Sequence, residues 1–71
     1  MKKSVTLEPL DSHRILVGNR IRYNNLDRES ALAKYGDEVS RPRFLEDGTV
    51  EEVSIEQAFN DHGQLYWSRI R

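Results

Sequence analysis

The first third of the chain alternates apolar and polar residues with period two, the spacing of a strand that is buried on one face. Residues 4–10 alternate in this way, and Pro9 places the strand at a sheet edge or end because proline has no N–H group for a central ladder. Residues 14–23 alternate again and put four apolar side chains on one face: Ile15, Val17, Ile21 and Tyr23. A three-residue loop over residues 11–13 aligns the apolar faces of both runs, so we predict one strand at 4–10 and a second at 14–23.

Gly18 and Asn19 leave a second interpretation of this segment open. The two residues together are a hairpin signal, which would fold residues 14–17 back onto residues 20–23. In that register apolar residues face arginines, and both faces of the ribbon become half charged. The pattern therefore favours one long strand in which Gly18 forms a bulge.

After Asn25 the period changes from two to that of a helix. Four residues recur at the spacing i, i+3, i+4, i+7 of a helix packed on a core: Arg28, Ala31, Leu32 and Tyr35. Asp27 is a suitable N-cap, and Gly36 stands where a helix commonly ends. We predict a helix over residues 27–35.

The strongest hairpin signal is the pair Asp47-Gly48, which separates short runs at 41–45 and 50–53. A two-residue turn would pair apolar with apolar and basic with acidic residues: Leu45 with Val50, and Arg43 with Glu52. We predict two further strands here.

The last part of the chain predicts a second helix and a final strand. Ser54 and Gln57 have the spacing of a capping box, which begins a helix. The residues of its apolar stripe are Ile55, Ala58, Phe59 and His62. Gly63 would end this helix, and residues 64–71 return to a strand pattern.

Together these elements predict a single small α+β domain over residues 1–71. It has a mostly antiparallel sheet of about five strands and two short helices, in the order β-β-α-β-β-α-β, with an SH3-like barrel with inserted helices as the alternative fold. Seventy-one residues without cysteine support only a small core, so we expect a homodimer or another protein partner to add stability. No apolar run has the length of a membrane span and no segment resembles a signal peptide, so we expect a soluble, cytoplasmic protein without a membrane partner.

The sequence contains no pattern typical of catalysis. Cysteine is absent, no serine has the context of a nucleophile, and the four glycines form no phosphate-binding loop. His13 and His62 are the only histidines, and they would share a metal ion only if the fold joined a loop to a helix end. We therefore expect no catalytic residue, no metal site and no cofactor, and we do not expect an enzyme.

Charge placement is the feature that points to partners. The net charge of −1 is the sum of +3 in residues 1–25, zero in 26–43, −6 in 44–63 and +2 in 64–71. We predict a charged sheet face with aromatic side chains nearby, formed by Arg14, Arg20, Arg22, Tyr66, Trp67, Arg69 and Arg71. A block of acidic residues carries the opposite charge and is the expected partner of that face: Glu46, Asp47, Glu51, Glu52 and Glu56.

Three interpretations of this charge pattern remain. The acidic block could simply pair with the arginines, within one chain or across a dimer. The favoured function is that of a small non-catalytic interaction protein, which binds another protein or itself through the charge-segregated sheet. The alternative is a nucleic-acid-binding module that uses the arginine-bearing face, although its near-neutral charge is unusual for that class.

Overall fold

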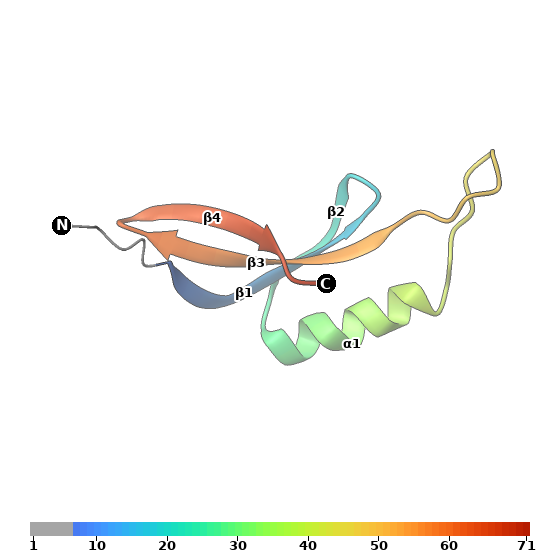
Figure 1. The fold of residues 1–71 in the computed structure, drawn as a ribbon. Coiled ribbons are helices and arrows are strands. Elements are labelled where there is room, and N and C mark those ends of the chain that lie inside the picture. The colour runs from blue at the N-terminus through green and yellow to red at the C-terminus, as the bar shows by residue number, and fades with distance from the viewer. Residues whose placement is uncertain (1–6) are drawn as a thin grey trace.

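The computed structural model describes residues 7–71 as one antiparallel sheet of four strands with a helix against one face (Figure 1). In chain order the elements are β1 (Glu8–Val17), β2 (Arg20–Leu26), α1 (Arg28–Val39), β3 (Val53–Asp61) and β4 (Gln64–Arg69). The strands lie in the order β2-β1-β3-β4, so β2 and β4 form the two edges. The predicted α+β class with an antiparallel sheet is confirmed, whereas residues 7–71 contain four strands and one helix instead of five and two. The open sheet also differs from the alternative of a closed barrel.

β1 differs from the two predicted strands that it replaces. It runs through residues 11–13, where the alternation predicted a loop, while residues 4–6 of the predicted first strand lie outside the described part of the chain. The register explains the difference: Pro9 pairs with Phe59 and His13 pairs with Gln57, so β1 contains two more residues than β3 over the same length. A bulge absorbs them, and the strand bends there instead of ending.

The predicted long strand over residues 14–23 is wrong, because the chain turns at Gly18-Asn19. Gly18 has φ +64°, as the first central residue of a type II′ turn requires, and its N–H donates to the Glu52 carbonyl at 2.8 Å. The expectation of one long strand rested on a consistent apolar face, yet β2 is an edge strand whose side chains are mostly exposed. Such a strand tolerates mixed faces.

α1 begins as predicted but ends later. The Asp27 side chain accepts a hydrogen bond from the Ser30 N–H at 2.8 Å, which caps the helix start. The helix then passes through Gly36 and ends at Val39. Glycine inside a helix costs only about 1 kcal/mol, and the extra turn carries Glu38 into contact with β2, as described below.

The predicted second helix is wrong, because its residues form β3. Val53, Ile55 and Gln57 face α1, since they pair with the β1 residues of that face. Ala58 lies on the other face and is also buried, so β3 has a buried apolar residue on each face and does not show simple alternation. His62 and Gly63 then make a turn, both with positive φ, into the predicted final strand, which is confirmed as β4.

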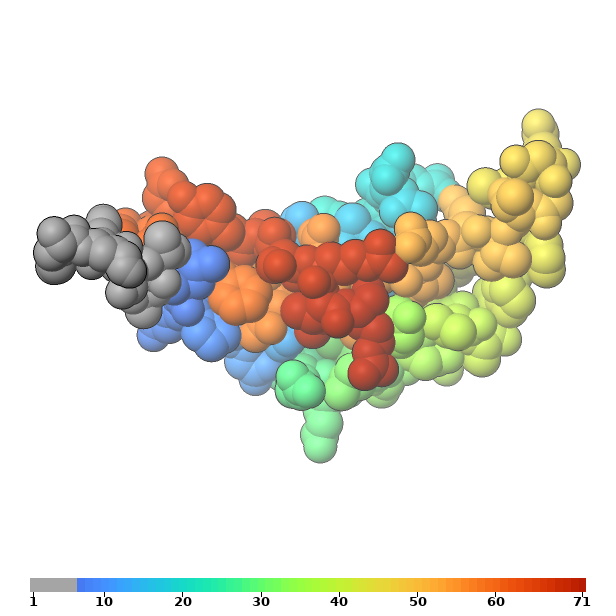
Figure 2. Space-filling model, viewed as in Figure 1, coloured from blue at the N-terminus to red at the C-terminus, as the bar shows by residue number. Residues whose placement is uncertain are grey.

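The segment between α1 and β3 forms a projecting arm, residues 41–52, at one end of the molecule (Figures 1 and 2). The chain turns here one residue earlier than predicted, because the Gly48 N–H donates to the Leu45 carbonyl at 2.9 Å and Glu46 and Asp47 are the central residues. The predicted flanking strands are reduced to one isolated bridge between Phe44 and Val50. The predicted pair of Leu45 with Val50 is therefore wrong by one residue. The two sides of the arm are joined to each other by this bridge and are not part of the four-stranded sheet.

The hydrophobic core lies between α1 and the sheet and is small. Ile15 and Ile55, which face each other across β1 and β3, pack on Ala31 of α1. Five partly buried side chains surround them: Tyr23, Leu26, Leu32, Tyr35 and Val53. The radius of gyration is 14.7 Å, against about 11 Å for a compact chain of this length, so the molecule is elongated.

Within residues 7–71 no helix has both the length and the apolar character to cross a membrane.

Candidate functional site

Arg14 lies at the centre of the sheet face that points away from the helix. Its Nη2 and Nε atoms are 2.6 and 2.7 Å from Oε1 of Glu56, the residue opposite it on β3. Its guanidinium group also lies 4.2 Å from the centre of the Trp67 ring. Both polar and stacking surfaces of this arginine are therefore used within the chain.

The structure distributes the other predicted arginines over three places. Arg69 lies on the same face as Arg14 and contacts Glu52 at 2.7 Å. Arg20 and Arg22 lie on the opposite edge strand, 3.8 Å from Glu51 and 3.6 Å from Glu38 respectively. Arg71 lies on the helix side, with its guanidinium 5.8 Å from the Tyr35 ring. Only Arg14, Trp67 and Arg69 are thus brought together on one face.

Tyr66 has a local role in β4. Its side chain is exposed, and its hydroxyl donates to Oε1 of Gln64 at 2.8 Å. It pairs with Phe59, so it points to the other side of the sheet from Trp67.

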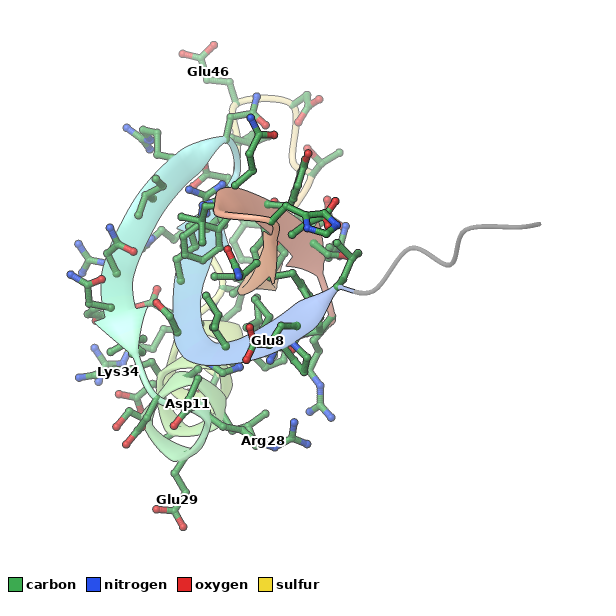
Figure 3. All side chains as sticks on the ribbon, turned by 90° about the vertical axis from the view of Figure 1, so that its left-hand side faces the viewer. Glu8, Asp11, Arg28, Glu29, Lys34 and Glu46 are labelled. Atoms are coloured by element: carbon green, nitrogen blue, oxygen red, sulfur yellow. The ribbon has the colours of Figure 1, made fainter. Side chains whose placement is uncertain are left out.

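The acidic block is divided between the sheet and the arm. Glu51, Glu52 and Glu56 each contact an arginine. Asp47 lies in the arm turn and accepts hydrogen bonds from the backbone N–H and the hydroxyl of Thr49, which lower its pKa. Glu46 points outward from the same turn (Figure 3).

Glu38 is a central residue that the sequence analysis did not single out. Its carboxylate is 8% exposed and lies 3.1 Å from Arg43 of the arm and 3.6 Å from Arg22 of β2. The Tyr23 hydroxyl also donates to it at 3.3 Å. The predicted Arg43–Glu52 pair is therefore replaced by a contact that anchors the arm to the helix end. Only the tertiary fold marks this glutamate, because the sequence shows it as one of two adjacent surface-like acids.

The two histidines are in unlike environments. His13 is 1% exposed, and its Nδ1 lies 3.2 Å from the Leu26 carbonyl, while its Nε2 has no hydrogen-bond partner among residues 7–71. An unsatisfied buried polar atom costs about 1–3 kcal/mol. His62 lies exposed in the β3–β4 turn, whereas His13 pairs with Gln57 in the middle of β3, so the two rings are not brought together. In this part of the chain no three potential ligands gather into a metal site.

Large apolar side chains gather on the arm and the adjoining helix end. We call this the apolar tip, and it consists of Val39, Phe44, Leu45 and Val50. Their exposed fractions lie between 46% and 68%, with Phe44 the highest. A hollow of about 180 Å³ separates the arm from the helix, and Val39, Pro42 and Val50 line it.

Comparisons with known proteins give no further guide to this site. No protein-family model, no curated protein and no solved structure matches the chain.

Proposed function

We propose that this chain is a non-catalytic interaction module that associates with a second copy of itself through the apolar tip of its arm. The observation that carries the proposal is the exposure of Val39, Phe44, Leu45 and Val50 at one end of the molecule. Single exposed apolar residues are ordinary, but several large ones on a short projecting segment and the helix end beside it are typical of a protein-binding surface.

The arm is held in place, which favours binding. The Glu51 N–H donates to the Arg43 carbonyl at 2.8 Å and the Leu45 N–H donates to the Thr49 carbonyl at 2.7 Å. The side chain of Arg43 contacts the buried Glu38 carboxylate. A segment ordered before binding loses less conformational entropy when it associates.

A second copy is the partner that the small core favours. Only five apolar residues are fully buried in the described chain: Ile15, Val17, Ala31, Ile55 and Ala58. Small domains without disulfides commonly gain the missing burial by association, and closed homodimers are the commonest form.

The pairing of the arginines is the reason to place the contact on the arm rather than on the charged sheet face. Six of the eight arginines have a carboxylate oxygen within 2.6 to 3.9 Å: Arg14, Arg20, Arg22, Arg41, Arg43 and Arg69. Nucleic-acid binding would require these contacts to be exchanged for phosphates, so self-association is better supported.

Sedimentation equilibrium over a range of protein concentrations tests the proposal. We expect a concentration-dependent dimer that Phe44→Ser weakens by at least about tenfold, because truncating a central apolar anchor costs about 2 kcal/mol. Leu65→Ser is the matched control, since Leu65 is 57% exposed and lies in β4, away from the arm. It should leave the dissociation constant unchanged. A chain that remains monomeric up to about 1 mM, or a dimer equally sensitive to both changes, would contradict the proposal.

A further inference from the structure

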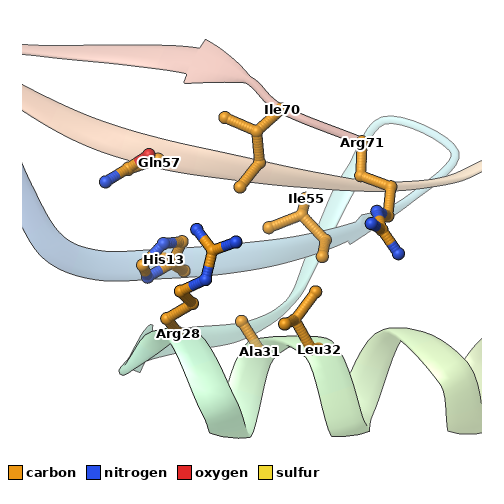
Figure 4. Close-up of a pocket in the computed structure, with 8 residues that line it drawn as sticks. All are labelled: His13, Arg28, Ala31, Leu32, Ile55, Gln57, Ile70 and Arg71. Carbon is orange, nitrogen blue, oxygen red and sulfur yellow. The ribbon is translucent and has the colours of Figure 1, made fainter.

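A cavity of about 150 Å³ lies between α1 and the sheet, beside the two residues that follow β4 (Figure 4). Its apolar wall consists of Ala31, Leu32, Ile55 and Ile70. A cavity of about this volume is large enough to hold a benzene ring. It is separate from the apolar tip, so the inference below does not depend on the proposed function.

The cavity collects the two arginines that have no carboxylate partner. Arg28 and Arg71 both line it, and neither has an acidic side chain within ion-pair distance among residues 7–71. Residues 1–6 contain no acidic residue. In Figure 4 the two side chains stand on either side of Ile55. Within residues 7–71 six arginines thus have an ion-pair partner, and the two that have none both line this half-apolar, half-polar cavity.

His13 adds to the same wall a buried ring nitrogen that has no hydrogen-bond partner among residues 7–71. Its Nδ1–H donates to the Leu26 carbonyl, so its Nε2 is the accepting nitrogen of the singly protonated ring, and this nitrogen has no partner in the described chain. Gln57, which also lines the cavity, donates its amide to the Leu10 carbonyl at 3.0 Å. The start of α1 is already satisfied by Asp27 and Asp11, which accept from the Ser30 and Arg28 N–H groups. The free polar groups of the cavity are therefore side chains and not the helix terminus.

We propose that this cavity binds a small monocarboxylic acid. Its carboxylate would lie between the guanidinium groups of Arg28 and Arg71, which suit planar anions. Its short aliphatic or single-ring body would rest on Leu32, Ile55 and Ile70. Ligand sites in general combine an apolar lining with a few convergent polar groups, as this cavity does.

A titration with sodium benzoate, followed by ¹H–¹⁵N NMR, tests the site. We expect saturable shifts centred on residues 31–32, 55 and 70, together with a change in the imidazole signals of His13. Benzamide has the same shape without the charge and is the matched ligand control. Arg28→Gln and Arg71→Gln should each weaken benzoate binding by about tenfold to 100-fold, as expected for a lost charge-assisted hydrogen bond. Arg41→Gln should not weaken it, since Arg41 lies on the arm, paired with Asp37.

Three results would overturn the proposal. These are the absence of saturation at about 50 mM benzoate, equal binding of benzoate and benzamide, and equal sensitivity to Arg28→Gln and Arg41→Gln. Because each of these is read from the cavity residues, failure of the site would leave the sedimentation result for the arm unaffected, and the reverse also holds.

Discussion

At the scale of single residues, Glu38 is the side chain that connects the most separate elements among residues 7–71. It joins the helix end, β2 and the arm through Tyr23, Arg22 and Arg43. A carboxylate that is nearly buried needs such partners, because desolvation penalises an unpaired charge. Its neighbour Asp37 is 60% exposed and has one contact with Arg41 at 3.9 Å.

This difference predicts unequal effects for two adjacent substitutions. Glu38→Ala should lower the free energy of unfolding by about 1–3 kcal/mol, because three donors lose their acceptor. Asp37→Ala should change it by about 0.5 kcal/mol or less, as surface ion pairs do. Urea denaturation of both variants measures the two values. Similar losses would show that Glu38 does not hold the arm and β2 together.

Two glycines give a second prediction, with opposite signs. Gly18 has φ +64°, and a Cβ atom there would lie 3.0 Å from Oε2 of Glu51. Gly36 is helical with nothing within 4 Å of a built Cβ. Gly18→Ala should therefore destabilise the protein by about 1 kcal/mol, and Gly36→Ala should stabilise it by up to about 1 kcal/mol. Thermal unfolding would show this as shifts of about 4–8 °C per kcal/mol in opposite directions.

At the scale of elements, the start of α1 is bonded by two carboxylates, those of Asp27 and Asp11, and Asp27 is its N-cap. Hydrogen bonds from Ser30 lower the pKa of Asp27 below its ordinary value of 3.8. A group with a lowered pKa in the folded state stabilises the protein above its unfolded pKa. That stability is lost as the pH falls through the folded pKa.

Asp27→Asn and Asp27→Ala separate the cap from its charge. Asparagine caps helices about as well as aspartate but does not titrate, so the stability difference from the natural protein should shrink as the pH falls from about 5 to 2. Alanine removes the cap and should lower the unfolding midpoint even below the folded pKa of Asp27, where the protonated carboxyl group still has a capping oxygen. Urea denaturation at several pH values provides the comparison. A constant difference for Asp27→Asn would exclude a lowered pKa.

The elements also show how far the sequence predicts the fold. The start of α1 was predictable because a cap and a helical stripe are local signals. β3 was not, because Ile55, Ala58 and Phe59 fit a helical stripe and a strand buried on both faces equally well. The choice between them is made by pairing with β1, far away in the chain. The same holds for the candidate site: the contact of Arg14 with Glu56 depends on a strand register that no local pattern contains.

At the scale of the whole molecule, a small core coexists with an exposed apolar tip. If association supplies the missing burial, folding and association are linked by mass action. The unfolding midpoint should therefore rise with protein concentration, and Phe44→Ser should reduce that dependence. Differential scanning calorimetry at about 10 μM and about 500 μM measures it. A midpoint that is independent of concentration in the natural protein would contradict the linkage.

The central pair of strands also determines the order in which the molecule can assemble. β1–β2 and β3–β4 are local hairpins, which form in about 1–10 μs, whereas Val17 and Val53 meet only when the chain between them closes. Docking of the two hairpins is then the slow step, because distant contacts form only after loop-closure entropy has been lost. α1 lies within that loop, and its early formation would replace part of the flexible chain by a rigid segment and so reduce the entropy lost on closure. Folding speed would thus depend on the helix and on the length of the arm more than on either hairpin.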